Sequence, residues 1–189
     1  MSQVQNGKLR NFYNMGNTDV KEGGFDVVSC QFSIHYYFKT PEMINIYLNN
    51  VSRSLKAGGR FIGCCLNGEA VFNALKGKDT ISNEGSTLIW KITKKYKQSK
   101  FSSSDASLGM EIGVYNESIG TTFNEYLANM DYLTKTCSKY GLKLVENDSF
   151  ENIYNSISNA KKYGRVKDMD DSMKPYSFLN NYFVYEKTF

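Results

Sequence analysis

The chain has 189 residues, the usual length of a single domain. Its net charge of +4 is mildly basic, which suits an anionic partner but is far from the charge of a nucleic-acid-binding arm. No segment approaches the roughly 20 apolar residues of a membrane helix, and the N-terminus lacks the apolar core of a signal peptide. We therefore expect a soluble intracellular protein that does not bind membranes.

The tyrosine and cysteine contents are compatible with more than one interpretation. The chain has 14 tyrosines, which suit stacking on nucleobases but are equally explained by a general drift in composition. The cysteines lack CxxC spacing, and a single histidine cannot complete a zinc site with them. We predict no metal site and interpret the cysteines as small buried thiols: Cys30, Cys64, Cys65 and Cys137.

The first predicted unit is a strand, a helix and a second strand. Residues 25–32, FDVVSCQF, form a short apolar run typical of a buried parallel strand. Thr40 and Pro41 are typical of a helix start, and an apolar stripe follows over about residues 41–57. Glycines end this helix, and 60–66, RFIGCCL, is the next strand. The order predicts a right-handed crossover between parallel strands, and hence an α/β fold.

The remaining elements are predicted as follows. We expect a short helix over 69–77, strands within 87–96 and 111–119, and a helix over 123–141. A strand at 142–150, a helix at 150–164, a charged loop at 165–175 and a strand at 180–189 complete the chain. We treat residues 1–24 as a loop-like N-terminal remnant and 25–189 as the domain.

Polar side chains cluster where the first strand ends. In open α/β sheets, ligands bind beyond the carboxyl ends of the parallel strands. The glutamine, histidine and phenol groups found there are suited to orienting a heterocycle, and the alternative is that they are plain packing residues. These residues are Gln31, Ser33, His35, Tyr36 and Tyr37.

Three further features have both a functional and a structural interpretation. Asn67 follows the second strand and is either ligand-facing or a turn residue. Glu125, expected at a helix start, is either a helix-capping glutamate or an acceptor for the N–H donors of guanine. A lysine cluster either screens phosphates or, as we prefer, protects an exposed strand edge: Lys91, Lys94, Lys95, Lys97 and Lys100.

The motifs resemble those of the mRNA cap (guanine-N7) methyltransferases. FDVVSCQFSIHYYF is similar to the family signature, and LKAGGRFIGCCLNG resembles its glycine-containing strand entry and asparagine exit. The segment that begins TTFNEYL and the closing NNYFVYEKTF follow in the family's order. The resemblance implies a partial class I, Rossmann-like methyltransferase sheet with a cap-binding insertion.

The resemblance also implies residue roles. No catalytic side chain is expected, because the family transfers a methyl group from S-adenosylmethionine to cap N7 by positioning alone. The cofactor side would be formed by Gln31, Ser29 and Phe32. The cap guanine would contact His35, Tyr36, Asn67, Glu125 and Tyr182.

One departure from the family pattern leaves two functions open. The glycine-rich S-adenosylmethionine loop of the family lies upstream of FDVVSCQF, where this chain has only 24 residues and no such motif. The chain is then either part of a cap methyltransferase or a non-catalytic cap-binding or stimulatory subunit. Expected partners are the capped 5′ end of RNA and the rest of a capping enzyme or a stimulatory subunit. The composition also suggests a large DNA-virus capping enzyme, and hence a nucleus, viral factory or virion.

Overall fold

The computed structural model describes residues 24–83, 85–159 and 169–189. Its larger sheet has the strand order β1 (Phe25–Gln31), β2 (Leu55–Leu66), β8 (Asn180–Lys187), β7 (Leu142–Ser149). β1 and β2 are parallel, whereas β8 is antiparallel to both of its neighbours. The predicted strand–helix–strand unit is therefore confirmed, with α2 (Pro41–Ser54) as its crossover helix. The predicted N-terminal remnant lies outside the described residues except for Gly24.

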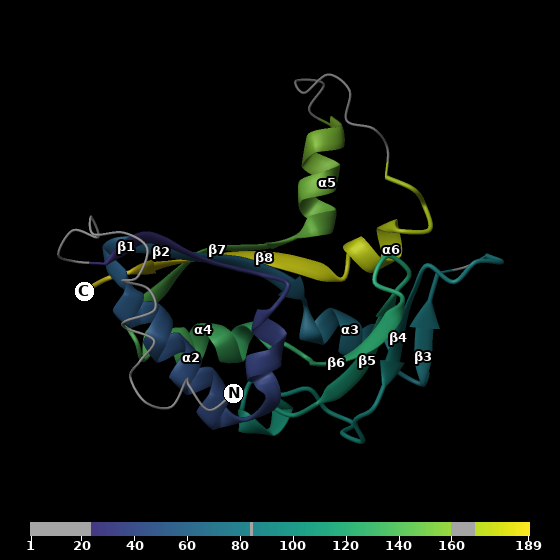
Figure 1. Cartoon of the computed structure of the whole chain (residues 1–189), viewed down its shortest axis with the longest axis horizontal. Coiled ribbons are helices and arrows are strands. Elements are labelled where there is room, and N and C mark those ends of the chain that lie inside the picture. The colour runs from purple at the N-terminus through teal and green to yellow at the C-terminus, as the bar shows by residue number, and fades with distance from the viewer. Residues whose placement is uncertain (1–23, 84, 160–168) are drawn as a thin grey trace.

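Helices cover one face of this sheet. α2 and α4 (Met130–Ser138) pack beneath it, while α5 (Phe150–Asn159) stands on the opposite side (Figure 1). The apolar stripe of α2 places Ile44 and Leu48, both 0% exposed, in a core with Phe61 of β2 and Phe183 of β8. Thr40 caps α2 by accepting a hydrogen bond from the Met43 amide, as the sequence predicts.

A smaller antiparallel sheet lies between α3 (Gly68–Ala74) and α4 in the chain. Its order is β3 (Thr80–Ser82), β4 (Trp90–Lys94), β5 (Glu111–Asn116), β6 (Thr121–Tyr126). One face packs with α3 around Trp90, Ile92 and Ile112, which form a second hydrophobic core. The short helix α6 (Lys174–Ser177) lies against this core, and the Trp90 indole N–H donates to the Ser172 carbonyl at 2.8 Å. The insertion is thus a packed unit of its own.

The predicted helix over 123–141 is wrong in its first part. Residues 121–126 form β6, paired with β5 along its full length. Gly120, at φ +76°, allows the tight turn that brings the two strands together. The helix begins only at Met130, after Asn129, whose side chain accepts a hydrogen bond from the Tyr132 amide. Glu125 consequently lies on a strand.

Other elements differ from prediction in smaller ways. β2 starts at Leu55, so Gly58 and Gly59, which were expected to lie before the strand, are part of it. The predicted 165–175 loop overlaps α6, and its first residues lie outside the described part of the chain. β4 is paired on both sides, with β3 and β5, so its lysines do not protect a sheet edge as we had expected. All four cysteines are buried free thiols, as predicted.

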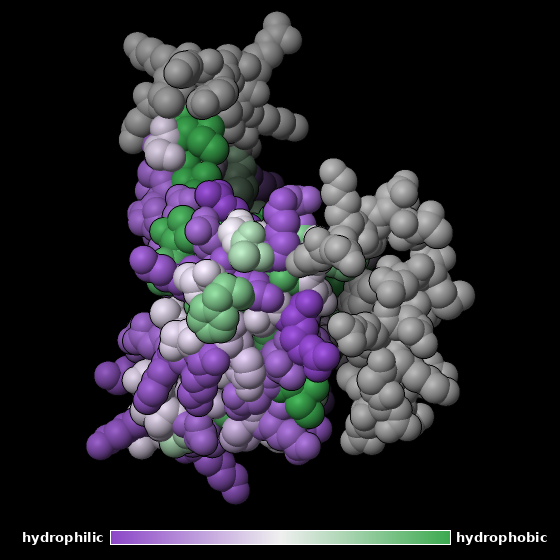
Figure 2. Space-filling view, turned by 90° about the vertical axis from the view of Figure 1, so that its left-hand side faces the viewer, coloured by the Kyte–Doolittle hydropathy of each residue, from purple (hydrophilic) through white to green (hydrophobic). Residues whose placement is uncertain are grey.

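Seen from one end of the larger sheet, the surface of the molecule is mostly polar. Figure 2 shows hydrophilic side chains dominating the lower part of that side, with hydrophobic residues in separate areas. No helix in the described ranges is long and apolar enough to cross a membrane.

Candidate guanine-binding site

A buried histidine and a largely buried carboxylate lie together where the segment after β1 meets the smaller sheet. His35 belongs to the short 3₁₀ helix η2 (Ile34–Lys39), which follows β1, and Glu125 belongs to β6. The His35 Nδ1 atom is 3.6 Å from Glu125 Oε2, and the two side chains are 6% and 14% exposed. Ile34 and Phe38, both 0% exposed, hold η2 in the core and so fix the histidine. Residues 90 positions apart in the sequence therefore meet at one point.

The His35 ring also has an unused hydrogen-bonding atom. Its Nε2 is buried and has no hydrogen-bond partner among the described residues. An unsatisfied buried polar atom costs about 1–3 kcal/mol, so such a group at a candidate site is typical of a ligand contact.

Burial dominates the protonation of this pair. A charged pair would lower the pKa of the glutamate and raise that of the histidine, whereas burial acts in the opposite direction on both. Burial raises the Glu125 pKa to about 7 and lowers the His35 pKa to about 4. Near neutral pH, His35 is uncharged and Glu125 is poised between its two forms. A ligand that donates hydrogen bonds would favour the carboxylate.

Two tyrosines lie near enough to the carboxylate for its charge to raise their pKa values. The Tyr36 ring contacts His35 edge to face with centroids 4.2 Å apart, and its side chain is 42% exposed. Burial, and then the Glu125 charge, raise the pKa of Tyr36, and the same causes raise that of Tyr176 to about 12. The neighbouring Tyr37 instead stacks on Tyr47 at 3.9 Å, so the adjacent tyrosines have different roles.

Tyr176 was not identified from the sequence. It lies on α6, where its ring packs on Trp90 with centroids 5.5 Å apart. Its location follows from tertiary contacts, because Trp90 is 86 positions away. The one local signal was Pro175, a residue favoured in the first turn of a helix.

The residues expected on the cofactor side lie at the carboxyl end of β1. Gln31 and Ser29 point away from the helix-covered core, and the Gln31 amide donates to Ser29 Oγ at 2.9 Å and accepts from the Cys64 thiol. Phe32 follows with φ +49°, a strained value for a residue other than glycine, and its ring is 55% exposed. These side chains face a different direction from the His35–Glu125 pair.

Two other residues expected at the cap guanine have hydrogen-bond partners elsewhere in the structure. The Asn67 side chain accepts from the Glu69 and Ala70 amides and so caps α3. The Tyr182 hydroxyl donates to Glu146 on the outer face of the larger sheet, and this hydrogen bond raises the Tyr182 pKa to about 12. The structure does not bring either side chain to Glu125.

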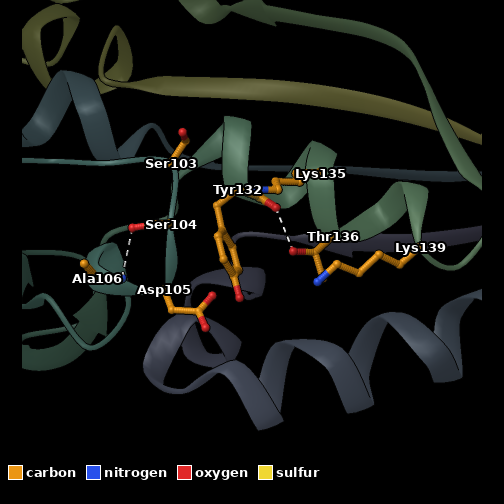
Figure 3. A pocket seen from close by; sticks show the side chains of 8 residues that line it. All are labelled: Ser103, Ser104, Asp105, Ala106, Tyr132, Lys135, Thr136 and Lys139. Atoms are coloured by element: carbon orange, nitrogen blue, oxygen red, sulfur yellow. Dashed lines mark hydrogen bonds between the residues drawn. The ribbon is translucent and has the colours of Figure 1, made fainter.

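Two surface hollows lie away from the His35–Glu125 pair. One, of about 300 Å³, is formed by the 103–106 loop and one side of α4, with Tyr132, Lys135, Thr136 and Lys139 (Figure 3). The second, of about 460 Å³, is polar and includes Asn67, Asn129 and Asn147. Neither contains His35 or Glu125.

The fold defines the class of protein. The structure aligns with the CcbJ methyltransferase of Streptomyces caelestis with a TM-score of 0.50 and 17% identity, over 92% of this chain and 61% of that one. It aligns with an S-adenosylmethionine-dependent methyltransferase from Listeria monocytogenes with a TM-score of 0.51 and 17% identity, over 87% of this chain and 62% of that one. This likeness shows the fold, which is the class I methyltransferase fold predicted from the sequence.

The sequence comparisons identify the family. The mRNA (guanine-N(7))-methyltransferase domain matches residues 6–179, so this chain belongs to that family. A probable mRNA-capping enzyme of Acanthamoeba polyphaga mimivirus is 33% identical over 95% of this chain, which spans 16% of that protein. An mRNA cap guanine-N(7) methyltransferase of Schizosaccharomyces pombe is 30% identical over 76% of this chain, which spans 39% of its length. The family predicted from the motifs is therefore confirmed.

Proposed function

We propose that this chain supplies the guanine-binding side of an enzyme that transfers a methyl group from S-adenosylmethionine to N7 of the mRNA cap. The observation that carries the proposal is the largely buried Glu125 carboxylate beside His35, whose buried Nε2 has no hydrogen-bond partner among the described residues. Its position in a chain of the cap methyltransferase family supports the assignment.

The chemistry of guanine matches these groups. Its Watson–Crick edge presents the N1–H and the exocyclic amine side by side, and a carboxylate can accept from both. The carbonyl O6 lies next to N1 and would accept from His35 Nε2, which has no hydrogen-bond partner among the described residues, in the neutral tautomer that carries its one proton on Nε2. The half-exposed Tyr36 ring supplies a flat surface for stacking. Adenine, with an acceptor at N1, would leave Glu125 without this pair of donors.

The residues at the end of β1 fit one side of a cofactor site. Gln31 and Ser29 would hold polar groups of S-adenosylmethionine, and the exposed Phe32 ring would contact an apolar part. Their place at the carboxyl end of a parallel strand is the usual ligand position in such sheets. β1 is hydrogen-bonded on one side only among the described residues, so these groups form one wall of the site. When bound, S-adenosylmethionine supplies the methyl group.

No general base is required for this reaction. Guanine N7 carries no proton, so the protein has only to hold the acceptor nitrogen and the donor methyl close and in line. Such positioning is worth roughly 7–11 kcal/mol of the barrier. A site built from a glutamate, a neutral histidine and tyrosines is consistent with a positioning role.

The proposal is tested by calorimetry with the cap dinucleotides GpppG and ApppA, which has no guanine. Binding of GpppG with at least about tenfold preference over ApppA would support it, because the hydrogen-bond pattern discriminates between the bases. Equal affinity for the two would contradict it. A parallel titration with S-adenosylmethionine distinguishes the two functions left open: GpppG binding without cofactor binding would favour a non-catalytic cap-binding subunit.

Guanine binding is expected to weaken as the pH falls through 7. The carboxylate form of Glu125 accepts the guanine donors, and its pKa is about 7, so acidification removes the competent form. Between pH 8 and pH 6 the ionised fraction falls about tenfold, and the GpppG affinity should fall by a similar factor. His35, with a pKa of about 4, stays neutral over this range. A flat profile in wild type, measured by calorimetry, would contradict the assignment.

Tyr36→Ala should weaken GpppG binding by about 1–3 kcal/mol, the range for loss of one stacking partner. Tyr36→Phe keeps the ring and should bind within about threefold of wild type. The measurement is fluorescence or calorimetric titration of both variants. If alanine and phenylalanine behave alike, Tyr36 does not stack on the base.

A further inference from the structure

The outer face of the smaller sheet is polar, basic and aromatic. Strand pairing places Ser82, Lys91, Tyr115 and Thr122 in one row across this face, and Thr80, Thr93, Gly113 and Asn124 in the next. The opposite face carries the apolar residues of the second core, among them Ile92, Ile112 and Val114. The smaller sheet is therefore two-sided: one face is packed, and the other is presented to solvent except at Tyr126, which packs against the first core.

The lysines on this face are not explained by edge protection. Lysines that discourage strand addition belong on edge strands. β4 is an inner strand, hydrogen-bonded to β3 and β5, and Lys91, its second residue, points to the outer face. A basic residue on an inner strand of a solvent-facing sheet calls for another explanation.

The charges and rings on the face fit a nucleic-acid strand. Lys91, Lys95 and Lys39 lie on it or at its corner, opposed by Glu111, which pairs with Lys95 at 3.6 Å. The Tyr115 ring, partly exposed, lies in the same row as Lys91. An aromatic ring beside ammonium groups on an open strand surface is the arrangement that binds single-stranded RNA by stacking and phosphate attraction. The Lys95 side chain lies across Gly113 in the centre of the face, where its ammonium donates to Asn124 Oδ1 at 2.6 Å.

The face is continuous with the guanine site. Glu125 and Tyr126 are adjacent on β6 and point to opposite faces of the sheet. η2 packs against β6 and contributes to both sides: Tyr36 lies by Glu125, and the Lys39 Nζ lies 6.0 Å from the Tyr126 ring centroid. A strand attached to a guanine held at Glu125 would meet Lys39 as it leaves the site.

We infer that the outer face of the β3–β6 sheet binds the single-stranded RNA that follows the cap, with Tyr115 stacking on a base and Lys91 and Lys95 contacting phosphates. The inference rests on the proposed function for its choice of RNA. It assigns to the insertion a second role, besides carrying Glu125.

The test uses fluorescence anisotropy with an uncapped single-stranded RNA of about ten nucleotides, the scale of one such binding surface. Tyr115→Ala should weaken binding by about tenfold, and Tyr115→Phe should retain it. Lys91→Gln should lower the slope of log affinity against log salt concentration by about 0.7, one phosphate contact on a single strand. Lys135→Gln, at an exposed lysine on α4, is the matched control and should match wild type.

GpppG binding by the same variants separates this inference from the proposed function. Tyr115→Ala and Lys91→Gln should leave GpppG affinity unchanged, because both residues lie on the face of the smaller sheet opposite Glu125. If the wild-type chain binds RNA but not GpppG, the guanine site is refuted and the RNA-binding face is not. RNA affinity that is absent in wild type, or unaffected by Tyr115→Ala and Lys91→Gln in chains shown by circular dichroism to be folded, would overturn the inference.

Discussion

Glu125→Ala is expected to reduce GpppG affinity at least about hundredfold, or about 3 kcal/mol at pH 8, where the carboxylate is ionised. Two hydrogen bonds to a charged acceptor are lost, each worth about 1.5–3 kcal/mol. The His35 and Glu125 side chains are only 6% and 14% exposed, so water is poorly placed to replace the lost acceptor. Calorimetric titration of the variant measures the loss directly.

Two controls make this result specific. Glu117→Ala removes an exposed glutamate from the turn between β5 and β6 and should bind like wild type. Glu125→Gln keeps the shape but offers only one acceptor oxygen, so its affinity should be weak and independent of pH. The guanine assignment fails if Glu125→Ala, folded as judged by circular dichroism, binds GpppG as well as wild type does.

Gly63→Ala is expected to lower the free energy of unfolding by about 3 kcal/mol. Gly63 lies in the middle of β2, where a Cβ atom would overlap the backbone carbonyl oxygen of Cys30 and the ring of Phe183. The ring could turn aside, but the carbonyl belongs to the hydrogen-bonded ladder between β1 and β2 and cannot. Urea unfolding measures the difference.

A second glycine of the same strand provides the comparison. Gly58 has φ +74° and no atom near the position of a Cβ. Gly58→Ala should therefore lower the free energy of unfolding only through the strain of a left-handed backbone, by about 1 kcal/mol. Phe183→Leu combined with Gly63→Ala should not restore stability, because the Cys30 contact remains. Equal losses for the two single variants would show that crowding at Gly63 is unimportant.

The larger sheet could be predicted because its signals are local. The apolar run of β1, the Thr40–Pro41 helix start and the apolar stripe of α2 lie within 30 residues of one another and specify a parallel crossover. The positions of Gln31 and His35 after β1 follow from the same reasoning. Nothing local indicated that the two side chains would face different directions, because the turn at Phe32 depends on an uncommon φ value.

The smaller sheet was harder to predict because its pairing is not local. Glu125 was expected in the first turn of a helix, since TTFNEYL runs into helical periodicity. The pairing of β6 with β5 overrides this tendency and buries the carboxylate, which raises its pKa. Tyr176 reaches the same region only through its packing on Trp90. The site depends on contacts that no short stretch of sequence contains.

The one-sided pairing of β1 has a practical consequence for handling the protein. Among the described residues β1 is paired on one side only, and a strand with such an open edge is a template for another chain. Val27 and Phe32 beside it are 49% and 55% exposed. Concentrated solutions of this polypeptide should therefore be prone to self-association, and light scattering against concentration would reveal it. A charged substitution at Val27, which points away from the core, should keep the sample monodisperse.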